Sequence, residues 1–141
     1  MERVMRGRAL IAGRAAGLAL VSAEPLSFWG GYDPQTGEII DRRHPLSGAN
    51  AAGRVLVLPA ARGSSTTTAI LLEAIRLGTA PNALLTNGPD TFFALASIVA
   101  DELYGRPLPL VALTPEDFAS LQSGDSVRIE DGSVVVTKVN P

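Results

Sequence analysis

The sequence of 141 residues contains no cysteine and only one histidine, His44. Without cysteine the chain can form no disulfide, offer no thiolate nucleophile and hold no iron–sulfur cluster or zinc ion through sulfur. A single histidine would leave carboxylates to supply nearly all the ligands of a zinc site, a combination rarely found in proteins. We therefore expect neither a metal site nor a cofactor site in this chain.

The chain also has no large excess of charge of either sign, since 12 basic and 14 acidic side chains leave a net charge of −2. No basic block stands out, which argues against a nucleic acid or a membrane surface as partner. No apolar run reaches the roughly 18 residues of a membrane span, and the N-terminus has no signal-like apolar core. We expect a cytoplasmic protein with a single domain over residues 1–141, long enough to bury a core of its own.

Short apolar runs alternate with segments of helical periodicity, which is typical of an α/β layer with parallel strands and helices packed on it. Strands are predicted at residues 8–11, 19–22, 55–58, 82–86 and 109–113, and helices at 64–78 and 90–104. A short helix is expected to follow Thr114, and a C-terminal hairpin is predicted over 126–130 and 133–139, around Asp131-Gly132.

Residues 26–53 differ from the rest, because they hold the only tryptophan and histidine among several glycines. A loop of this length in a compact domain is usually functional or disordered, and its aromatic residues argue against disorder. A short strand over 38–41 is possible within it. Candidates for a site rim or a subunit interface are Trp29, Tyr32, Asp33, Arg42 and His44. The alternatives are a plain Asp-Pro turn at Asp33, a structural histidine, and a tryptophan buried in the core.

The chain is organised around the segment in which the strand at 55–58 is followed by Pro59, a tight turn and the helix opened by Ser64-Ser65. Free N–H groups at a helix start favour negative charge, so an anionic ligand or a serine alkoxide would suit this position. The alternative is that one serine is simply the N-cap of the helix. A Gly-x-Ser-x-Gly elbow and the glycine spacing and lysine of a P-loop are both missing.

Several short motifs closely resemble the small subunit of aconitase X, a swivelling domain of the aconitase superfamily. The resemblance covers nearly the whole chain, and the motifs are Gly30-Gly31-Tyr32-Asp33, Thr36-Gly37, Ile40-Asp41-Arg42, His44-Pro45, Arg62-Gly63-Ser64-Ser65-Thr66, Leu72-Glu73-Ala74-Ile75, Ile98-Val99-Ala100 and Glu102-Leu103-Tyr104-Gly105. The fold that it implies is a swivelling β/β/α domain with a parallel strand–helix–strand core and a C-terminal hairpin.

The resemblance implies one subunit of a hydro-lyase that dehydrates a small hydroxy acid. The first expectation for the substrate is cis-3-hydroxy-L-proline, and the alternative is phosphomevalonate. Such enzymes use an iron–sulfur cluster held by cysteines, so the cluster is expected on a separate, cysteine-bearing large subunit, and this chain is expected to be inactive alone. An alternative of another class is a non-catalytic anion-binding or scaffold module.

By motif position the resemblance makes Ser64 the base that removes a substrate proton, with Arg62, Gly63, Ser65 and Thr66 as substrate-binding residues. Thr66 departs from the superfamily, in which an arginine at this place grips a substrate carboxylate. Arg62 is the nearest replacement, and its alternative role is that of a solvated turn residue.

Overall fold

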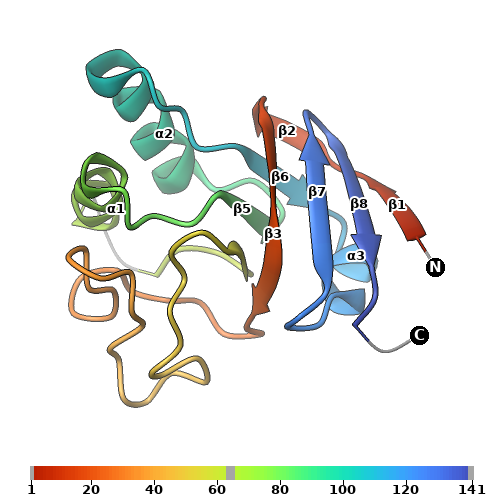
Figure 1. Cartoon of the computed structure of the whole chain (residues 1–141), viewed down its shortest axis with the longest axis horizontal. Coiled ribbons are helices and arrows are strands. Elements are labelled where there is room, and N and C mark those ends of the chain that lie inside the picture. Colours follow the sequence, from red (N-terminus) through yellow and green to blue (C-terminus); the bar gives the residue numbers. More distant parts are fainter. Residues whose placement is uncertain (1, 63–65, 140–141) are drawn as a thin grey trace.

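The structure, a computed structural model, describes residues 2–62 and 66–139. Figure 1 shows two helices, α1 and α2, packed on one side of the strands, and the C-terminal hairpin on the other. The elements in chain order are β1 (Glu2–Arg6), β2 (Arg8–Ile11), β3 (Arg14–Val21), β4 (Val55–Leu58), α1 (Thr66–Leu77), β5 (Ala83–Asn87), α2 (Thr91–Tyr104), β6 (Leu110–Leu113), α3 (Pro115–Ser120), β7 (Ser126–Glu130) and β8 (Ser133–Thr137).

The centre of the sheet is parallel, because β4 pairs in parallel with both β3 and β5, and β5 pairs in parallel with β6. Every residue of β4 and β6 is buried, as expected for strands covered on both faces. Leu56 and Leu84 pack with the helices, whereas Val57 and Leu85 belong to a second cluster on the opposite face. These alternating positions confirm the predicted strand–helix–strand core.

The sheet order β1-β8-β7-β3-β4-β5-β6-β2 places consecutive strands at its two ends. Because Gly7 alone joins β1 to β2, the sheet curls round until its ends meet. A Cβ at Gly7 would overlap the Val111 side chain and lie 2.8 Å from the Ala112 carbonyl oxygen, so this crossing requires glycine. The sequence did not predict β1, whose exposed and charged residues carry a weak apolar pattern.

One further strand, β3, differs in length from the prediction, whereas the C-terminal hairpin has the predicted turn. β3 starts at Arg14 instead of residue 19 and runs through Gly17, where a Cβ would lie 2.9 Å from the Gly53 carbonyl oxygen. Glycine therefore serves here to let two backbones approach and not to break the strand. The hairpin of β7 and β8 turns at Asp131, which has a φ of 55°, and confirms the predicted turn.

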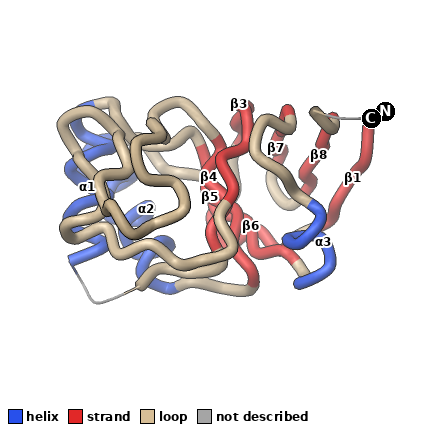
Figure 2. The backbone as a smooth tube through the Cα atoms, turned by 90° about the horizontal axis from the view of Figure 1, so that it is seen from below, coloured by secondary structure: helices blue, strands red, loops and turns tan. Residues whose placement is uncertain are grey.

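The long loop between β3 and β4 contains no extended strand at 38–41. Two isolated bridges, Tyr32 to Ile39 and Glu38 to Asn50, replace it. Apolar loop residues such as Phe28 pack with the helices and the parallel strands in one core cluster. Figure 2 shows the loop as an irregular segment folded against the helical end of the molecule. Among residues 2–62 and 66–139, no helix is both long and apolar enough to cross a membrane.

Candidate functional site

The serine turn, defined here as residues 59–66, connects the carboxyl end of β4 to the start of α1. β4 ends at Leu58, as the sequence predicts, and α1 is described from Thr66 onward. Gly63, Ser64 and Ser65 lie outside the described residues, so the site is built from the residues on either side of them. Ligands of parallel α/β sheets bind at the carboxyl ends of the strands, which is where this turn lies.

Arg62 is held by its backbone and leaves its side chain exposed. Its N–H donates to the Leu26 carbonyl at 3.1 Å, and its carbonyl accepts a bond from the Thr67 hydroxyl at 3.5 Å. Among the described carboxylates, none is paired with its guanidinium. A fixed backbone and an unpaired cation at the edge of the turn are what an anion-binding arginine needs.

Asp90 ties the serine turn to the second helix. One carboxylate oxygen accepts the Ala61 N–H at 2.7 Å, and the other accepts the Phe93 N–H at 3.0 Å, which makes Asp90 the N-cap of α2. Asp90 is 8% exposed, so both bonds are shielded from water. In the sequence, Asp90 is placed only as the first residue of the predicted helix at 90–104. Its position after the strand next to β4 was the signal for the second bond, since carboxyl ends of adjacent parallel strands meet.

The start of the long loop lies beside this turn. Leu26 forms a parallel bridge with Ala61, and the Phe28 ring meets the edge of Phe93 at a centroid distance of 5.5 Å. Trp29 comes next in the chain and is 68% exposed. It is therefore an outward-facing residue near the turn, and burial in the core, the alternative interpretation, does not apply. Arg42 is also exposed, further along the loop.

Tyr32 and Asp33 lie with the opposite end of α1. The Tyr32 hydroxyl donates to the Thr79 carbonyl at 2.7 Å, and the Thr79 hydroxyl donates to the Pro34 carbonyl at 2.6 Å. Thr79 lies two residues beyond the end of α1, a helix of 12 residues and about 18 Å, whereas the serine turn leads into the start of that helix. Tyr32 is 2% exposed, so the structure assigns it to the packing of the loop and not to an open rim. Burial raises the pKa of Tyr32 well above its usual range.

His44 is part of the interior of the loop. Its Nδ1 accepts the Leu46 N–H at 3.1 Å, so the ring proton resides on Nε2, which faces the Glu24 carbonyl at 3.3 Å. Both ring nitrogens are thus engaged by backbone within the loop. Asp33 likewise accepts the Gln35 N–H at 2.9 Å in an ordinary Asx turn. The structural interpretation is the better one for both residues.

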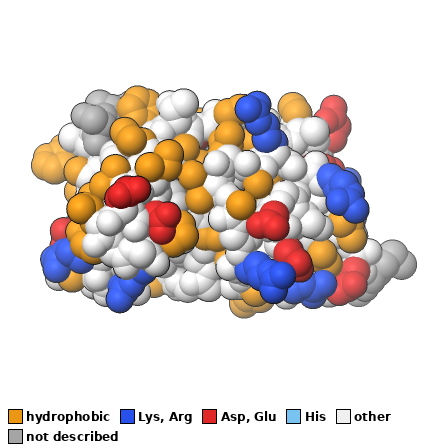
Figure 3. Space-filling view, turned by 90° about the horizontal axis from the view of Figure 1, so that it is seen from above, with side chains coloured by type: hydrophobic (Ala, Val, Ile, Leu, Met, Phe, Trp, Pro, Cys, Tyr) orange, Lys and Arg blue, Asp and Glu red, His pale blue; other side chains and the backbone are white. Residues whose placement is uncertain are grey.

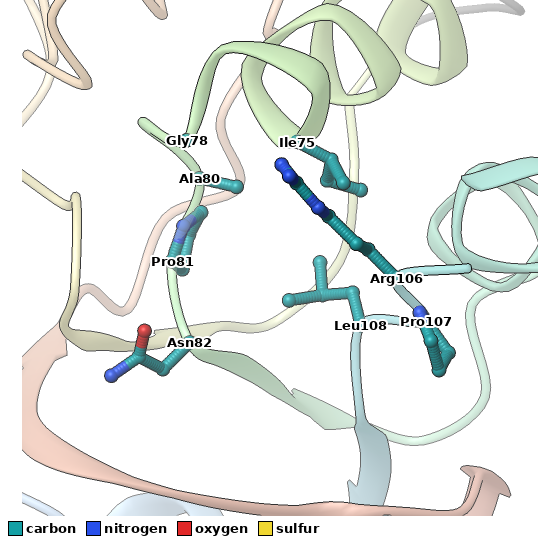
Figure 4. A pocket seen from close by; sticks show the side chains of 8 residues that line it. All are labelled: Ile75, Gly78, Ala80, Pro81, Asn82, Arg106, Pro107 and Leu108. Carbon is teal, nitrogen blue, oxygen red and sulfur yellow. The ribbon is translucent and has the colours of Figure 1, made fainter. Parts of the chain in front are cut away.

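A pocket of about 230 Å³ opens at the other edge of the sheet. Figure 4 shows the Arg106 side chain extending across it towards Ile75, with Asn82 and Leu108 below. Asn82 and Leu108 precede the amino ends of β5 and β6, so this pocket faces away from the carboxyl ends where the serine turn lies. None of the site residues predicted from the sequence lines this pocket. The serine turn therefore remains the candidate site.

The curled sheet with a parallel centre, α1 and α2 on one face, and a serine turn after β4 together define an α/β domain of the swivelling type. The chain matches the family described as "Aconitase X swivel domain" over residues 4–138, and it belongs to this family. The crystal structure of Thermococcus kodakaraensis aconitase X superimposes with a TM-score of 0.85 at 30% identity, covering 96% of this chain and 99% of that one.

Two curated relatives match most of this chain but differ in how much of their own length the match covers. Cis-3-hydroxy-L-proline dehydratase of Pseudomonas aeruginosa is 46% identical over 95% of this chain, but the match spans only 23% of that relative. The phosphomevalonate dehydratase small subunit of Methanothermobacter thermautotrophicus is 36% identical over 87% of this chain and 88% of its own length. The same domain thus occurs within a much longer chain and as a separate subunit.

Proposed function

We propose that this chain is the small subunit of an aconitase X-type hydro-lyase. The observation that carries the proposal is the 46% identity to a cis-3-hydroxy-L-proline dehydratase over 95% of the chain. The relative named a small subunit, which has nearly the same extent, supports a separate chain that works within a complex. Alone, the chain should be inactive, because three quarters of the Pseudomonas relative has no counterpart in it.

The proposed reaction is the removal of water from cis-3-hydroxy-L-proline or a related small hydroxy acid, since the identity to that dehydratase is the higher of the two. Phosphomevalonate is the second candidate, favoured by the archaeal relatives that share the small-subunit form. Both substrates present an anionic group, which suits the exposed Arg62 and the N–H groups at the start of α1.

The proposed base is Ser64, which would accept a proton from substrate carbon. A serine hydroxyl is a weak acid, so its alkoxide needs stabilisation. N–H groups at the start of a helix can stabilise such a charge as an oxyanion hole does. Arg62, Gly63, Ser65 and Thr66 are proposed to bind substrate, and the bond between Ala61 and Asp90 would keep the turn in place.

The aconitase superfamily implies an iron–sulfur cluster, and the residues of this chain do not fit one. The sequence has no cysteine, and the described residues include no group of three or more histidine, aspartate and glutamate side chains able to hold a metal. The proposed holder is therefore a cysteine-bearing large subunit. This chain would contribute the proton acceptor and part of the anion-binding surface across the subunit interface.

The test is Ser64→Ala in the reconstituted complex, with Ser65→Ala as the matched control. If Ser64 is the base, turnover should fall by about 10²–10⁴ while assembly is unchanged. Ser65→Ala should retain far more activity and mainly lower stability, by about 1 kcal/mol if Ser65 caps the helix. The reverse ranking would make Ser65 the base. Turnover of both variants within a fewfold of wild type would favour a non-catalytic anion-binding or scaffold module. Both substrates should be assayed with the same preparation.

A further inference from the structure

The outward face of α2 carries apolar side chains where a solvated helix carries charge. No charged residue occurs between Asp90 and Asp101. Phe92, Leu95 and Ile98 are spaced three residues apart and thus share one face, and Leu95 and Ile98 are 49% and 51% exposed. They line an apolar hollow of about 390 Å³. Figure 3, which looks down on α2, shows hydrophobic side chains gathered over this end of the molecule.

This face adjoins the serine turn. The Ala61 N–H donates to the carboxylate of Asp90 immediately before α2, and the Thr68 hydroxyl in the first turn of α1 donates to the Phe92 carbonyl at 3.3 Å. The start of α2 is therefore bonded to both described flanks of the turn. A partner protein bound to this face of α2 would therefore also lie close to the serine turn.

We propose that the α2 face, defined by Phe92, Leu95 and Ile98, docks the large subunit of the complex; this inference rests on the proposed function. The large subunit would present an apolar surface to the three side chains. Aromatic and aliphatic anchors of this kind form the centre of stable interfaces, and an uncharged exposed helix face is otherwise rare on a soluble domain.

The relatives favour this occupant over a second copy of the chain. In the Pseudomonas and Hypocrea jecorina dehydratases the matched segment is 23% and 22% of one polypeptide, so there the domain is joined to a much larger partner. In the archaeal small subunits the same segment is nearly the whole chain. A domain found both joined and separate needs a face that binds the larger part, and a shared active site requires that face to lie beside the serine turn.

The experiment measures binding of Leu95→Glu and Ile98→Glu chains to the large subunit of the same organism, recognised as the counterpart of the remaining part of the Pseudomonas relative. Glutamate is a good helix former, so both variants should fold, which circular dichroism checks. Each substitution should raise Kd roughly tenfold or more, and the double variant should raise it further. Leu18→Glu is the matched control, since Leu18 is 50% exposed on β3 and should leave Kd unchanged.

Binding is read without turnover, so the docking face and the proposed function fail separately. Wild-type binding that survives both α2 substitutions would overturn the docking face and leave the small-subunit role intact. An equal effect of Leu18→Glu would also overturn it, because the loss would not be specific to α2. A wild-type dimer that Leu95→Glu converts to monomer would assign the face to self-association instead. No binding by the folded wild-type chain would overturn both proposals.

Discussion

Asp90→Ala should destabilise the chain well beyond the loss of an ordinary helix cap. The carboxylate accepts one N–H from α2 and one from the serine turn, and it is 8% exposed. Loss of the cap alone costs about 1 kcal/mol. Loss of the charge-assisted bond to Ala61 adds about 1.5–3 kcal/mol. A total of about 3 kcal/mol is a large part of the 5–15 kcal/mol that stabilises a typical domain, and it should lower Tm by roughly 10 °C.

Two further variants separate the contributions. Asp90→Asn keeps a good N-cap but has only one acceptor oxygen, so it should lose mainly the bond to Ala61. Thr114→Ala removes a cap with a single bond, from the Asp117 N–H at 3.2 Å, on the exposed start of α3. It should cost about 1 kcal/mol. Urea unfolding followed by circular dichroism measures all three free energies of unfolding with one protocol.

The serine turn should respond to Asp90→Asn more than the fold does. Below the unfolding transition, the reconstituted complex should show a lower kcat with an unchanged Kd for assembly, because Ala61 is no longer anchored while α2 remains capped. Thr114→Ala should leave kcat unchanged. Asp90 does not hold the turn if Asp90→Ala costs no more stability than Thr114→Ala, or if Asp90→Asn matches wild type in both stability and kcat.

Three further predictions address the loop, the C-terminal end and the turn. Tyr32→Phe should cost about 1–2 kcal/mol in urea unfolding, because the Thr79 carbonyl loses its donor; no change would mean that water replaces the hydroxyl. Asp125 is fully buried; burial alone would raise its pKa, but bonds from Lys138 and two backbone N–H groups lower it overall. The stability that Asp125 contributes should therefore be present above its unfolded pKa of about 3.9 and disappear as pH falls through the lower folded pKa. Asp125→Asn should flatten the loss of stability at acid pH. An unaltered plot of stability against pH would contradict this role of Asp125. Arg62→Ala should raise KM roughly tenfold to a hundredfold, with partial recovery in Arg62→Lys; unchanged kinetics would make Arg62 a plain turn residue.

The parallel core could be predicted because its sequence signals are local. Four-residue apolar runs such as Val55–Leu58 have few structural alternatives to a buried strand. Asp90, an aspartate directly before an apolar helix, marks where that helix begins. The strand β1 could not be predicted in the same way. Its pairing with β8 comes from the opposite end of the chain, and only Met5 among its residues is buried. Strand pairing over such a distance leaves no local pattern to read.

The long loop shows the limit of composition as a guide to function. Its aromatic and charged residues indicated a site rim, yet Tyr32 packs on Phe28 at a centroid distance of 5.0 Å, and both nitrogens of His44 face backbone atoms. A loop without regular hydrogen bonding must satisfy its buried polar groups with side chains, so polar residues are needed there for structure alone. Only burial and bonding partners separate these residues from the exposed Trp29.

The position of Asp90 has a consequence for how the site tolerates change. Residues 59–62, the described part of the serine turn before α1, form no helix or extended strand, so they are held by their neighbours: Leu26 in the loop, and Asp90 before α2. The proposed docking face begins two residues after Asp90. A subunit bound there would contact the same helix start that holds Ala61. Assembly would then restrain the serine turn through the carboxylate of Asp90. Coupling between docking and catalysis should therefore weaken in Asp90→Asn, seen as non-additive effects of that substitution and Leu95→Glu on kcat in a double-mutant cycle. Strict additivity would show that the two surfaces act independently.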